Sequence, residues 1–442
     1  MNATLTLEAA ASSLSDLLPF DVIGQVSGIS GLALDLVGFG GHLSVGDRVW
    51  ITAKSGEQVP AEAVGFHEGV TRAMTFGTLD GIGPGAPVVA GRPGGLAVSD
   101  RWLGRVIDPL GRPMDGLGTL HAGPHRASVR CAPPNAAVRS RLGHRIDLGV
   151  KALNCFATCR EGQRLGLFAG SGVGKSTLLS MLARYTRCDV AVIALVGERG
   201  RELREFIEDD LGEAGLTRSV VVVATSDQPP LMRRECAYAA TSVAEHFRKQ
   251  GKSVLLLMDS VTRFCLALRE IGLSAGEPPT TRGFPPSVFA ELPKLLERAG
   301  PGLAGEGMIT GLYTVLVEGD DQNEPVADAV RGILDGHVVL DRRIGEAGRY
   351  PAVDVLRSLS RTVPGVNPAR DNALMSRARA ILATWQEMAD LVRLGAYKAG
   401  TDPAVDEAVR IAPRIEAFLS QRKAEPCSVE QGFDDLEQAM AS

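Results

Sequence analysis

The spacing of hydrophobic and polar residues changes along the chain, and the changes divide it into regions. Residues 1–18 repeat apolar positions every three or four residues, which predicts a short amphipathic helix. Residues 20–95 alternate short apolar runs with turns such as Gly40-Gly41, a pattern typical of a small β-barrel. Further along, unbroken apolar runs alternate with helical stretches, which predicts buried parallel strands of a doubly wound α/β core. These runs cover residues 190–196, 219–223, 253–258 and 309–317.

The C-terminal region follows a helical pattern. One stripe of apolar residues is more typical of a core face than of a chemical site. Asp402-Pro403 predicts the cap and first position of a second helix, which we expect Pro413 to kink or break. Ser428 and Gln431 have the spacing of a capping box for a final helix. The stripe runs through Leu374, Ala378, Ile381, Trp385, Met388 and Val392.

Composition is that of an ordinary soluble protein. The 442 residues are too many for one core, and 45% apolar with 22% charged residues is a usual globular balance. A net charge of −5 gives no general attraction to nucleic acid or anionic lipid. No apolar run is long enough to predict a membrane span, and the lack of Lys or Arg before Arg48 argues against a secretory signal. Scattered cysteines fit reduced thiols in a cytoplasmic protein.

The most specific chemical signal is the run Ala-Gly-Ser-Gly-Val-Gly-Lys-Ser-Thr at residues 169–177. A strand-like stretch precedes it and a helical pattern follows, which is the context that a phosphate-binding loop requires. Its glycines let backbone N–H groups surround phosphate oxygens of ATP, and Lys175 is expected to hold the β- and γ-phosphates. The Ser176 hydroxyl is expected to bind Mg²⁺. The expected nucleotide-binding residues of the loop are Gly170, Ser171, Gly172, Val173, Gly174, Lys175, Ser176 and Thr177.

Other polar residues follow neighbouring strands of the same predicted core. Asp259 ends an apolar run, the position from which P-loop proteins hold the shell of Mg²⁺. Glu198 follows another run, where it either polarises a water for attack on the γ-phosphate or pairs with a nearby arginine in a surface cluster. An arginine finger is also expected, but the residues alone rank Arg361 no higher than Arg199 or Arg263.

Several segments occur in the order seen in the catalytic subunits of rotary ATP synthases. They are the phosphate loop, Gly-Glu-Arg-Gly-Arg-Glu at 197–202, the run ending in Asp259, Arg-Tyr-Pro-Ala-Val-Asp at 349–354 and Ser-Leu-Ser-Arg at 358–361. Segments 276–289 and 317–325 resemble the type III export branch of that family, specifically the flagellum-specific ATP synthases. The resemblance covers nearly the whole chain, and Ala169 in place of the first glycine of the loop is compatible with it.

The resemblance implies a role for each matching position. It makes Glu198 the catalytic carboxylate, acting beside Lys175, and it makes Arg361 the finger that enters the neighbouring subunit's site. The remaining matches are Tyr350 stacked on adenine, Arg199 and Arg263 as further site residues, and Ser176 with Asp259 at Mg²⁺.

The resemblance also implies a multidomain architecture and an assembly. The expected domains are a partner-binding helix at 1–19, a β-barrel at 20–95, a RecA-like P-loop ATPase domain at 96–365 and a C-terminal α-helical domain at 366–442. Because Glu198 and Arg361 lie on one chain, a head-to-tail homohexamer can close on itself. Its ATP hydrolysis is expected to energise type III protein export for bacterial flagellum assembly.

The partners implied by the resemblance fall on different parts of the chain. A stator-like regulator is expected at the N-terminal helix, and a stalk-like coiled-coil protein at the ring centre, near Glu318–Asp321 and the C-terminal helices. Export chaperone–substrate complexes and a membrane export gate, reached through partners, complete the set. The protein is therefore expected in the cytoplasm, peripherally associated with the inner-membrane export apparatus, with no nucleic acid bound.

Other classes of protein share parts of this pattern. An injectisome ATPase for virulence proteins would have the same chemistry and remains the alternative. The loop at 320–324 argues against a true ATP synthase catalytic subunit, and Glu198 argues against a non-catalytic subunit. An RNA-translocating helicase would need a basic, aromatic-bearing barrel, whereas the basic residues of 20–95 are Arg48, Lys54, Arg72 and Arg92.

Overall fold

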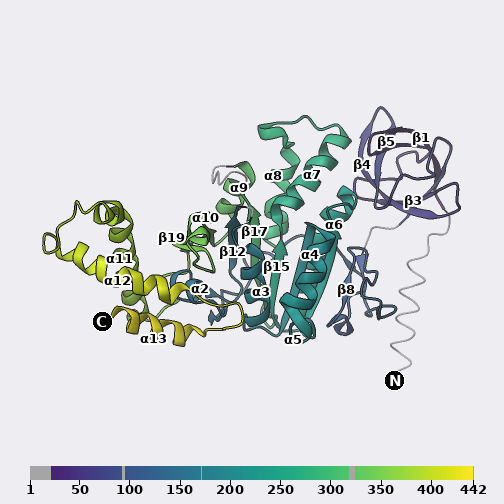
Figure 1. The fold of residues 1–442 in the computed structure, drawn as a ribbon. Coiled ribbons are helices and arrows are strands. Elements are labelled where there is room, and N and C mark those ends of the chain that lie inside the picture. The colour runs from purple at the N-terminus through teal and green to yellow at the C-terminus, as the bar shows by residue number, and fades with distance from the viewer. Residues whose placement is uncertain (1–20, 92–94, 171, 318–323, 442) are drawn as a thin grey trace, which may run out of the picture.

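The computed structural model describes residues 21–91, 95–170, 172–317 and 324–441 (Figure 1). The helix expected at 1–18, the residue Ser171 and the expected stalk-facing segment Glu318–Asp321 lie outside these ranges. A β-barrel lies at one end of the molecule, an α/β core in the middle and a group of C-terminal helices at the other end (Figure 1). Within the described ranges, no helix combines the length and the apolar character needed to cross a membrane.

The predicted barrel forms, and its strands are all paired antiparallel. Side chains alternate across the wall, as the two-residue period of a strand requires: Val49 and Ile51 are fully buried, while Trp50 between them is 39% exposed. In order around the closed barrel the strands are β1 (Ile23–Ser30), β2 (Ala33–Val37), β5 (Val70–Thr75), β4 (Gln58–His67), β3 (Arg48–Thr52) and β6 (Pro87–Ala90).

The α/β core is built on one large, mainly parallel sheet. The four apolar runs predicted as strands all belong to it, and the prediction of a doubly wound core is confirmed. The edge strand β19 (Val353–Ser360) and the short β16 (Gly300–Pro301) run antiparallel to their neighbours. In order from β19 the others are β18 (Gly336–Leu340), β12 (Arg164–Ala169), β17 (Met308–Leu316), β15 (Ser253–Asp259), β13 (Val190–Glu198), β14 (Ser219–Thr225) and β8 (Val106–Ile107).

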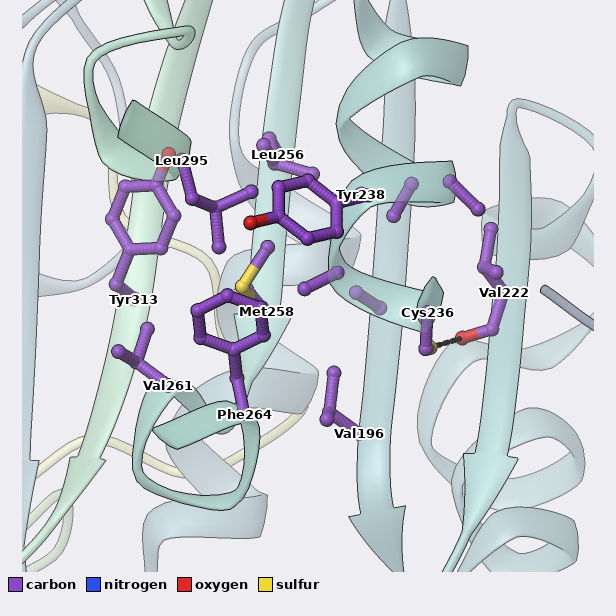
Figure 2. Packing of buried hydrophobic residues seen from close by; sticks show 14 of the residues in the cluster. Val196, Val222, Cys236, Tyr238, Leu256, Met258, Val261, Phe264, Leu295 and Tyr313 are labelled. Atoms are coloured by element: carbon purple, nitrogen blue, oxygen red, sulfur yellow. Dashed lines mark hydrogen bonds between the residues drawn. The ribbon is translucent and has the colours of Figure 1, made fainter. Parts of the chain in front are cut away.

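Helices cover both faces of this sheet because its strands are apolar on both sides. Figure 2 shows one face, where Tyr238 of α6 (Pro230–Lys249) and Phe264 of α7 (Val261–Ala275) pack over Leu256 and Met258 of β15. The two rings meet edge to face with centroids 5.6 Å apart. The opposite face is covered by α2 (Lys151–Phe156), α3 (Lys175–Tyr185) and the C-terminal helices.

The remaining elements connect these layers. The short strands β7 (Gly95–Leu96) and β9 (Ala127–Ser128) pair with each other, as do β10 (Arg145–Ile146) and β11 (Cys159–Arg160). The further helical elements are η1 (Asp100–Trp102), α4 (Gly200–Glu205), η2 (Phe206–Leu211), α5 (Gly212–Leu216), η3 (Thr281–Gly283), α8 (Pro286–Leu296), α9 (Pro325–Ile333) and α10 (Arg342–Glu346).

The C-terminal region consists of α11 (Ala369–Arg393), α12 (Pro403–Leu419) and α13 (Val429–Met440). The expected break at Pro413 is wrong, because α12 continues through it. Proline removes one helical hydrogen bond, but Ile411, Ala412 and Ile415 are fully buried around it, so packing holds the helix together. Asp402 caps α12 as predicted, accepting from the N–H of Ala404.

Two finer predictions for this region hold in part. Ser428 accepts from the N–H of Gln431, but the Gln431 side chain donates to Asp435 at 2.5 Å, so half of the capping box forms. On α11, Ala378 and Ile381 of the predicted stripe are buried, whereas Trp385 is only partly buried.

Candidate active site

Neighbouring parallel strands bring the predicted site residues together at one edge of the sheet. The strands β12, β17, β15 and β13 lie side by side, and their carboxyl ends open onto the same edge. The phosphate loop follows β12, Asp259 ends β15 and Glu198 ends β13. This is where open α/β sheets bind ligands.

The loop has the backbone geometry that a phosphate site needs. Gly172 and Gly174 have φ angles of 75° and 87°, which L side chains rarely adopt. Gly174 precedes α3, and no side chain caps that helix. The first N–H groups of α3 are therefore available to an anion, and the helix dipole favours one there.

Lys175, Asp259 and Glu198 form a compact charged group beside the loop. The Lys175 ammonium donates to both carboxylate oxygens of Asp259, at 2.5 and 2.7 Å, and lies 3.5 Å from Glu198 Oε1. Thr314 of β17 also donates to Asp259 Oδ1, at 2.6 Å. Asp259 is thus held by two donors, and Lys175 is neutralised until a more highly charged phosphate competes for it.

Glu198 has the environment of a proton acceptor. Burial raises the pKa of this carboxyl, the nearby Asp259 charge raises it further, and Lys175 and Arg263 oppose them without reversing the shift. Its Oε1 atom is buried without a hydrogen-bond partner among the described residues. Carboxylates with raised pKa values are typical of acid–base sites.

A small pocket of about 80 Å³ lies between the loop and Glu198. Ser176, Asp259 and Glu198 all line it. The residues fit Mg²⁺, which takes one or two carboxylates with a hydroxyl and completes its shell with substrate phosphates and water. The described residues contain no cluster of three or more His, Cys, Asp or Glu side chains that could hold a metal ion.

Tyr350 and Arg263 also reach this site, whereas Arg199 stays at its rim. The Tyr350 ring is 43% exposed and lies so close to the loop that a Cβ on Gly174 would come within 3.1 Å of it. Arg263 packs its aliphatic part against Gly197. The Arg199 side chain is largely exposed and lies 3.5 Å from Glu202.

Arg361 lies far from all of these residues in its own chain. It follows β19, whose last residue Ser360 pairs with Gly336, while the loop end of β12 is level with Leu340 and Val353. β19 bulges between the two levels, so their separation is better measured on β18, where Gly336 and Leu340 are four residues apart. This corresponds to about 13 Å, more than the length of an arginine side chain. The exposed Arg361 side chain therefore cannot reach a phosphate bound at its own loop.

Sequence reasoning missed Thr314, which is fully buried. It lies in an apolar strand, and its role depends on the alignment of β17 with β15, where Met258 is level with Tyr313. The sequence carries no local signal for that alignment.

Comparison with known proteins matches this arrangement to one family. Residues 149–360 match the nucleotide-binding domain of the ATP synthase alpha/beta family, and residues 367–438 match the C-terminal domain of the type III secretion ATPase EscN. A flagellum-specific ATP synthase from Caulobacter vibrioides is 52% identical over 96% of this chain and 97% of its own length. The chain belongs to the ATP synthase alpha/beta family.

Other members of the ATP synthase alpha/beta family agree over similar lengths. A type 3 secretion system ATPase from Xanthomonas euvesicatoria is 47% identical over 90% of this chain and 89% of its own. The solved structure of assembled EscN from enteropathogenic E. coli has a TM-score of 0.88 at 39% identity, covering 94% of this chain and all of that one. A second structure contains EscN in complex with its central stalk EscO, at a TM-score of 0.86.

Proposed function

We propose that this chain is a Mg²⁺-dependent ATPase that works as a homohexameric ring and energises type III protein export for bacterial flagellum assembly. One observation carries the proposal. The nucleotide loop, Lys175, Glu198 and Asp259 lie at the carboxyl ends of the parallel strands, whereas Arg361 lies at their amino ends. A chain arranged in this way needs a neighbour to complete its site.

The described residues divide the chemistry of hydrolysis among themselves. Lys175 and the first N–H groups of α3 bind the β- and γ-phosphates, and Tyr350 stacks on adenine. Glu198 accepts a hydrogen bond from the attacking water and takes its proton. Ser176 and Asp259 would hold Mg²⁺, which neutralises charge on the phosphates when bound.

The remaining positive charge comes from the adjacent subunit. Arg361 of that subunit stabilises the anionic oxygens of the transition state, a contribution of about 10³–10⁵ in rate in related phosphoryl transfers. Arg263 supports the ionised form of Glu198, and Arg199 is proposed as a further nucleotide-binding residue at the rim of the site.

Export partners follow from the relatives rather than from the described residues. Because EscN binds its central stalk EscO, we infer a stalk-like coiled-coil partner at the ring centre. A stator-like regulator at the N-terminal helix, chaperone–substrate complexes and an export gate reached through partners are proposed on the same basis. Cytoplasmic localisation, with peripheral association to the export apparatus, completes the proposal.

A second candidate is an injectisome ATPase, favoured by the likeness to EscN. Deleting the gene separates the two. Loss of flagellar filaments and motility, restored by the wild-type gene, supports the flagellar function. Intact motility with loss of virulence-protein secretion supports the injectisome.

The central test of the chemistry is Glu198→Gln, which keeps the side-chain shape and removes the proton acceptor. We expect ATP turnover to fall by about 10²–10⁴-fold, while ring assembly, followed by light scattering, is unchanged. Glu202→Gln is the matched control, since Glu202 lines the same pocket and the proposed mechanism gives it no part in activating the water. Near-normal turnover of Glu198→Gln would refute the assignment.

A further inference from the structure

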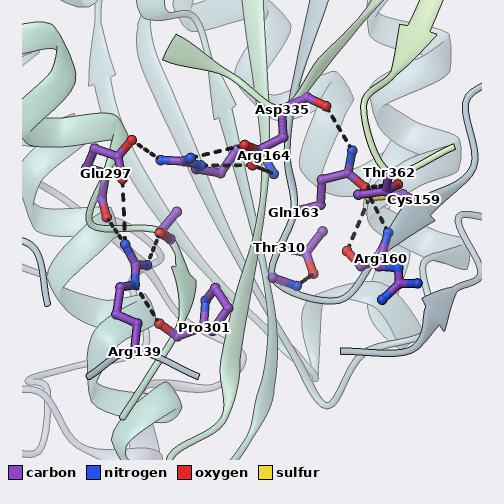
Figure 3. Close-up of polar contacts among 12 residues, drawn as sticks. Arg139, Cys159, Arg160, Gln163, Arg164, Glu297, Pro301, Thr310, Asp335 and Thr362 are labelled. Carbon is purple, nitrogen blue, oxygen red and sulfur yellow. Dashed lines mark hydrogen bonds and ion pairs between the residues drawn. The ribbon is translucent and has the colours of Figure 1, made fainter. Parts of the chain in front are cut away.

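We infer that Gln163 is a positioning residue for catalysis in the neighbouring subunit, because it holds the segment that carries Arg361. This inference rests on the proposed function of Arg361 as a finger acting between subunits. Gln163 lies in the turn between β11 and β12 and is fully buried. It is part of the hydrogen-bonded group of residues in Figure 3.

The hydrogen bonds of the Gln163 amide go to the finger segment, to Asp335 just before β18 and to its own turn. Its Nε2 donates to the carbonyl of Asp335 at 3.1 Å and to Ser360 Oγ at 2.9 Å. Its Oε1 accepts from Thr362 Oγ1 at 3.0 Å and from the N–H of Arg160 at 2.9 Å (Figure 3). One side chain therefore binds the residues on both sides of Arg361.

The backbone of Arg361 is fixed by the same acceptor that Gln163 uses. The Arg361 N–H donates to the Asp335 carbonyl at 2.9 Å. The Asp335 carboxylate is held in turn by Arg164, whose Nε and Nη2 donate to it at 3.0 and 3.1 Å (Figure 3). Arg361 thus extends from a rigid base, although its own side chain is exposed.

This arrangement matters because an exposed arginine has many rotamers, and its reach into another subunit depends on where its Cα is held. A displacement of about 1 Å at a catalytic group can cost about 10²-fold in rate. Replacing Gln163 by leucine would remove one hydrogen bond each from the Asp335 carbonyl, Ser360 and Thr362, and would take away the acceptor of the Arg160 N–H. The two hydroxyls would still bind the Thr158 carbonyl and each other. The backbone around Arg361 would then be held less firmly, and its guanidinium group would be positioned less accurately in the neighbouring site.

The test uses two chains that are inactive alone. A site donor carries Arg361→Ala and keeps Glu198; a finger donor carries Glu198→Gln and keeps Arg361. Assembled together in equal amounts, they complete a site only where a finger donor faces a site donor, so about a quarter of interfaces in a closed ring are active. Gln163→Leu is then added to one donor at a time, and ATP turnover of the mixed rings is measured.

We expect Gln163→Leu to reduce turnover by roughly tenfold or more in the finger donor and by less than about twofold in the site donor. Thr362→Val removes one of the two donors to Gln163 Oε1, at a position less buried than Gln163, and should give the same asymmetry. It decides the question if Gln163→Leu does not fold.

Thr310→Val is the matched control. Thr310 is buried beside the same turn and accepts from the N–H of Gly162 at 3.0 Å. Its loss should act equally in both donors. Equal losses in both donors for Gln163→Leu, or no loss in either, would overturn the positioning role. If the two parent donors regain no activity together, the finger assignment itself fails, which is a separate result.

Discussion

At the scale of single residues, two charged side chains of the site are paired with each other rather than with a ligand. Lys175 and Asp259 neutralise each other at 2.5 Å, although each is expected to face a ligand of opposite charge during turnover. In the proposed mechanism, a triphosphate would attract Lys175 more strongly than one carboxylate does, which would leave Asp259 available to hold Mg²⁺. Thr314 keeps Asp259 in place during the exchange.

The raised pKa of Glu198 predicts a pH dependence. Its active form is the carboxylate, so kcat/KM should fall as the pH drops through that pKa, which lies above the ordinary value of 4.5. Steady-state rates across a pH series will locate this acid limb. Glu202→Gln should move the limb to slightly lower pH, because the Glu202 charge also raises the pKa of Glu198. A wild-type limb at or below 4.5 would contradict the assignment.

The position of Tyr350 predicts a binding effect. Tyr350→Ala should raise KM for ATP by roughly tenfold, since stacking of a base on an aromatic ring contributes about 1–3 kcal/mol. Tyr350→Phe keeps the ring and should leave KM nearly unchanged. Equal weakening by both variants would mean that the hydroxyl, rather than the ring face, contacts the nucleotide.

Residues whose chemistry is local could be found from the sequence, and the others could not. Lys175 and Ser176 were predicted from the phosphate-loop motif, and Asp259 from its position at the end of an apolar run. From the residues alone, Glu198 had two interpretations, and the structure adds that its side chain is largely buried beside Lys175. Thr314 and Gln163 contact partners 55 and 197 residues away in the chain, so no local pattern could reveal them.

At the scale of elements, a buried ionic network joins the barrel to the core. Glu62 of β4 accepts from Arg234 of α6 at 2.6 Å and from Arg130 at 2.8 Å. Arg48 of β3 binds Glu235 at 2.5 Å. Burial acts to raise the pKa of Glu62, but the arginines, Arg234 first, bring it below its ordinary value. The barrel therefore depends on paired charges at this joint.

Glu62→Gln should destabilise the protein by about 3–5 kcal/mol, because it removes the nearer carboxylate of the buried Arg234, which then has only Glu235 at 3.3 Å. Urea unfolding will measure this, with the exposed Glu57→Gln as the control. The wild-type contribution is present above the ordinary pKa of 4.5 and is lost as the pH falls through the depressed value. An unchanged unfolding midpoint for Glu62→Gln would refute the role of the network.

The elements themselves were predicted well where burial sets the pattern. Apolar runs located the central strands, and alternation located the barrel. The predictions weakened where tertiary packing overrides local preference, as at Pro413 inside α12. They also weakened towards the end of α11, where Met388 and Val392 of the predicted stripe are only partly buried.

At the scale of the whole molecule, strand order separates the two halves of the site. The sequence supplied both Glu198 and Arg361, but it could not say that β19 runs antiparallel at the sheet edge and carries Arg361 away from the loop. The need for a neighbour follows from that topology.

Turnover should therefore depend on assembly. The ATPase rate per subunit is expected to rise steeply with protein concentration for the wild type, because dilute subunits lack a neighbour's finger. Arg361→Ala should stay low at every concentration, and light scattering of the same samples will report the rings. A concentration-independent rate together with normal turnover by Arg361→Ala would contradict a shared site.

The placement of Arg361 opposite the nucleotide loop also gives each subunit a front and a back. In the proposed ring, an open arc of subunits would always end with one loop that no arginine enters and one arginine that enters no loop. Closing the arc joins these two ends, so it completes a catalytic site without adding a chain. The ATPase rate per subunit should therefore be lower in a partly built arc than in a closed ring.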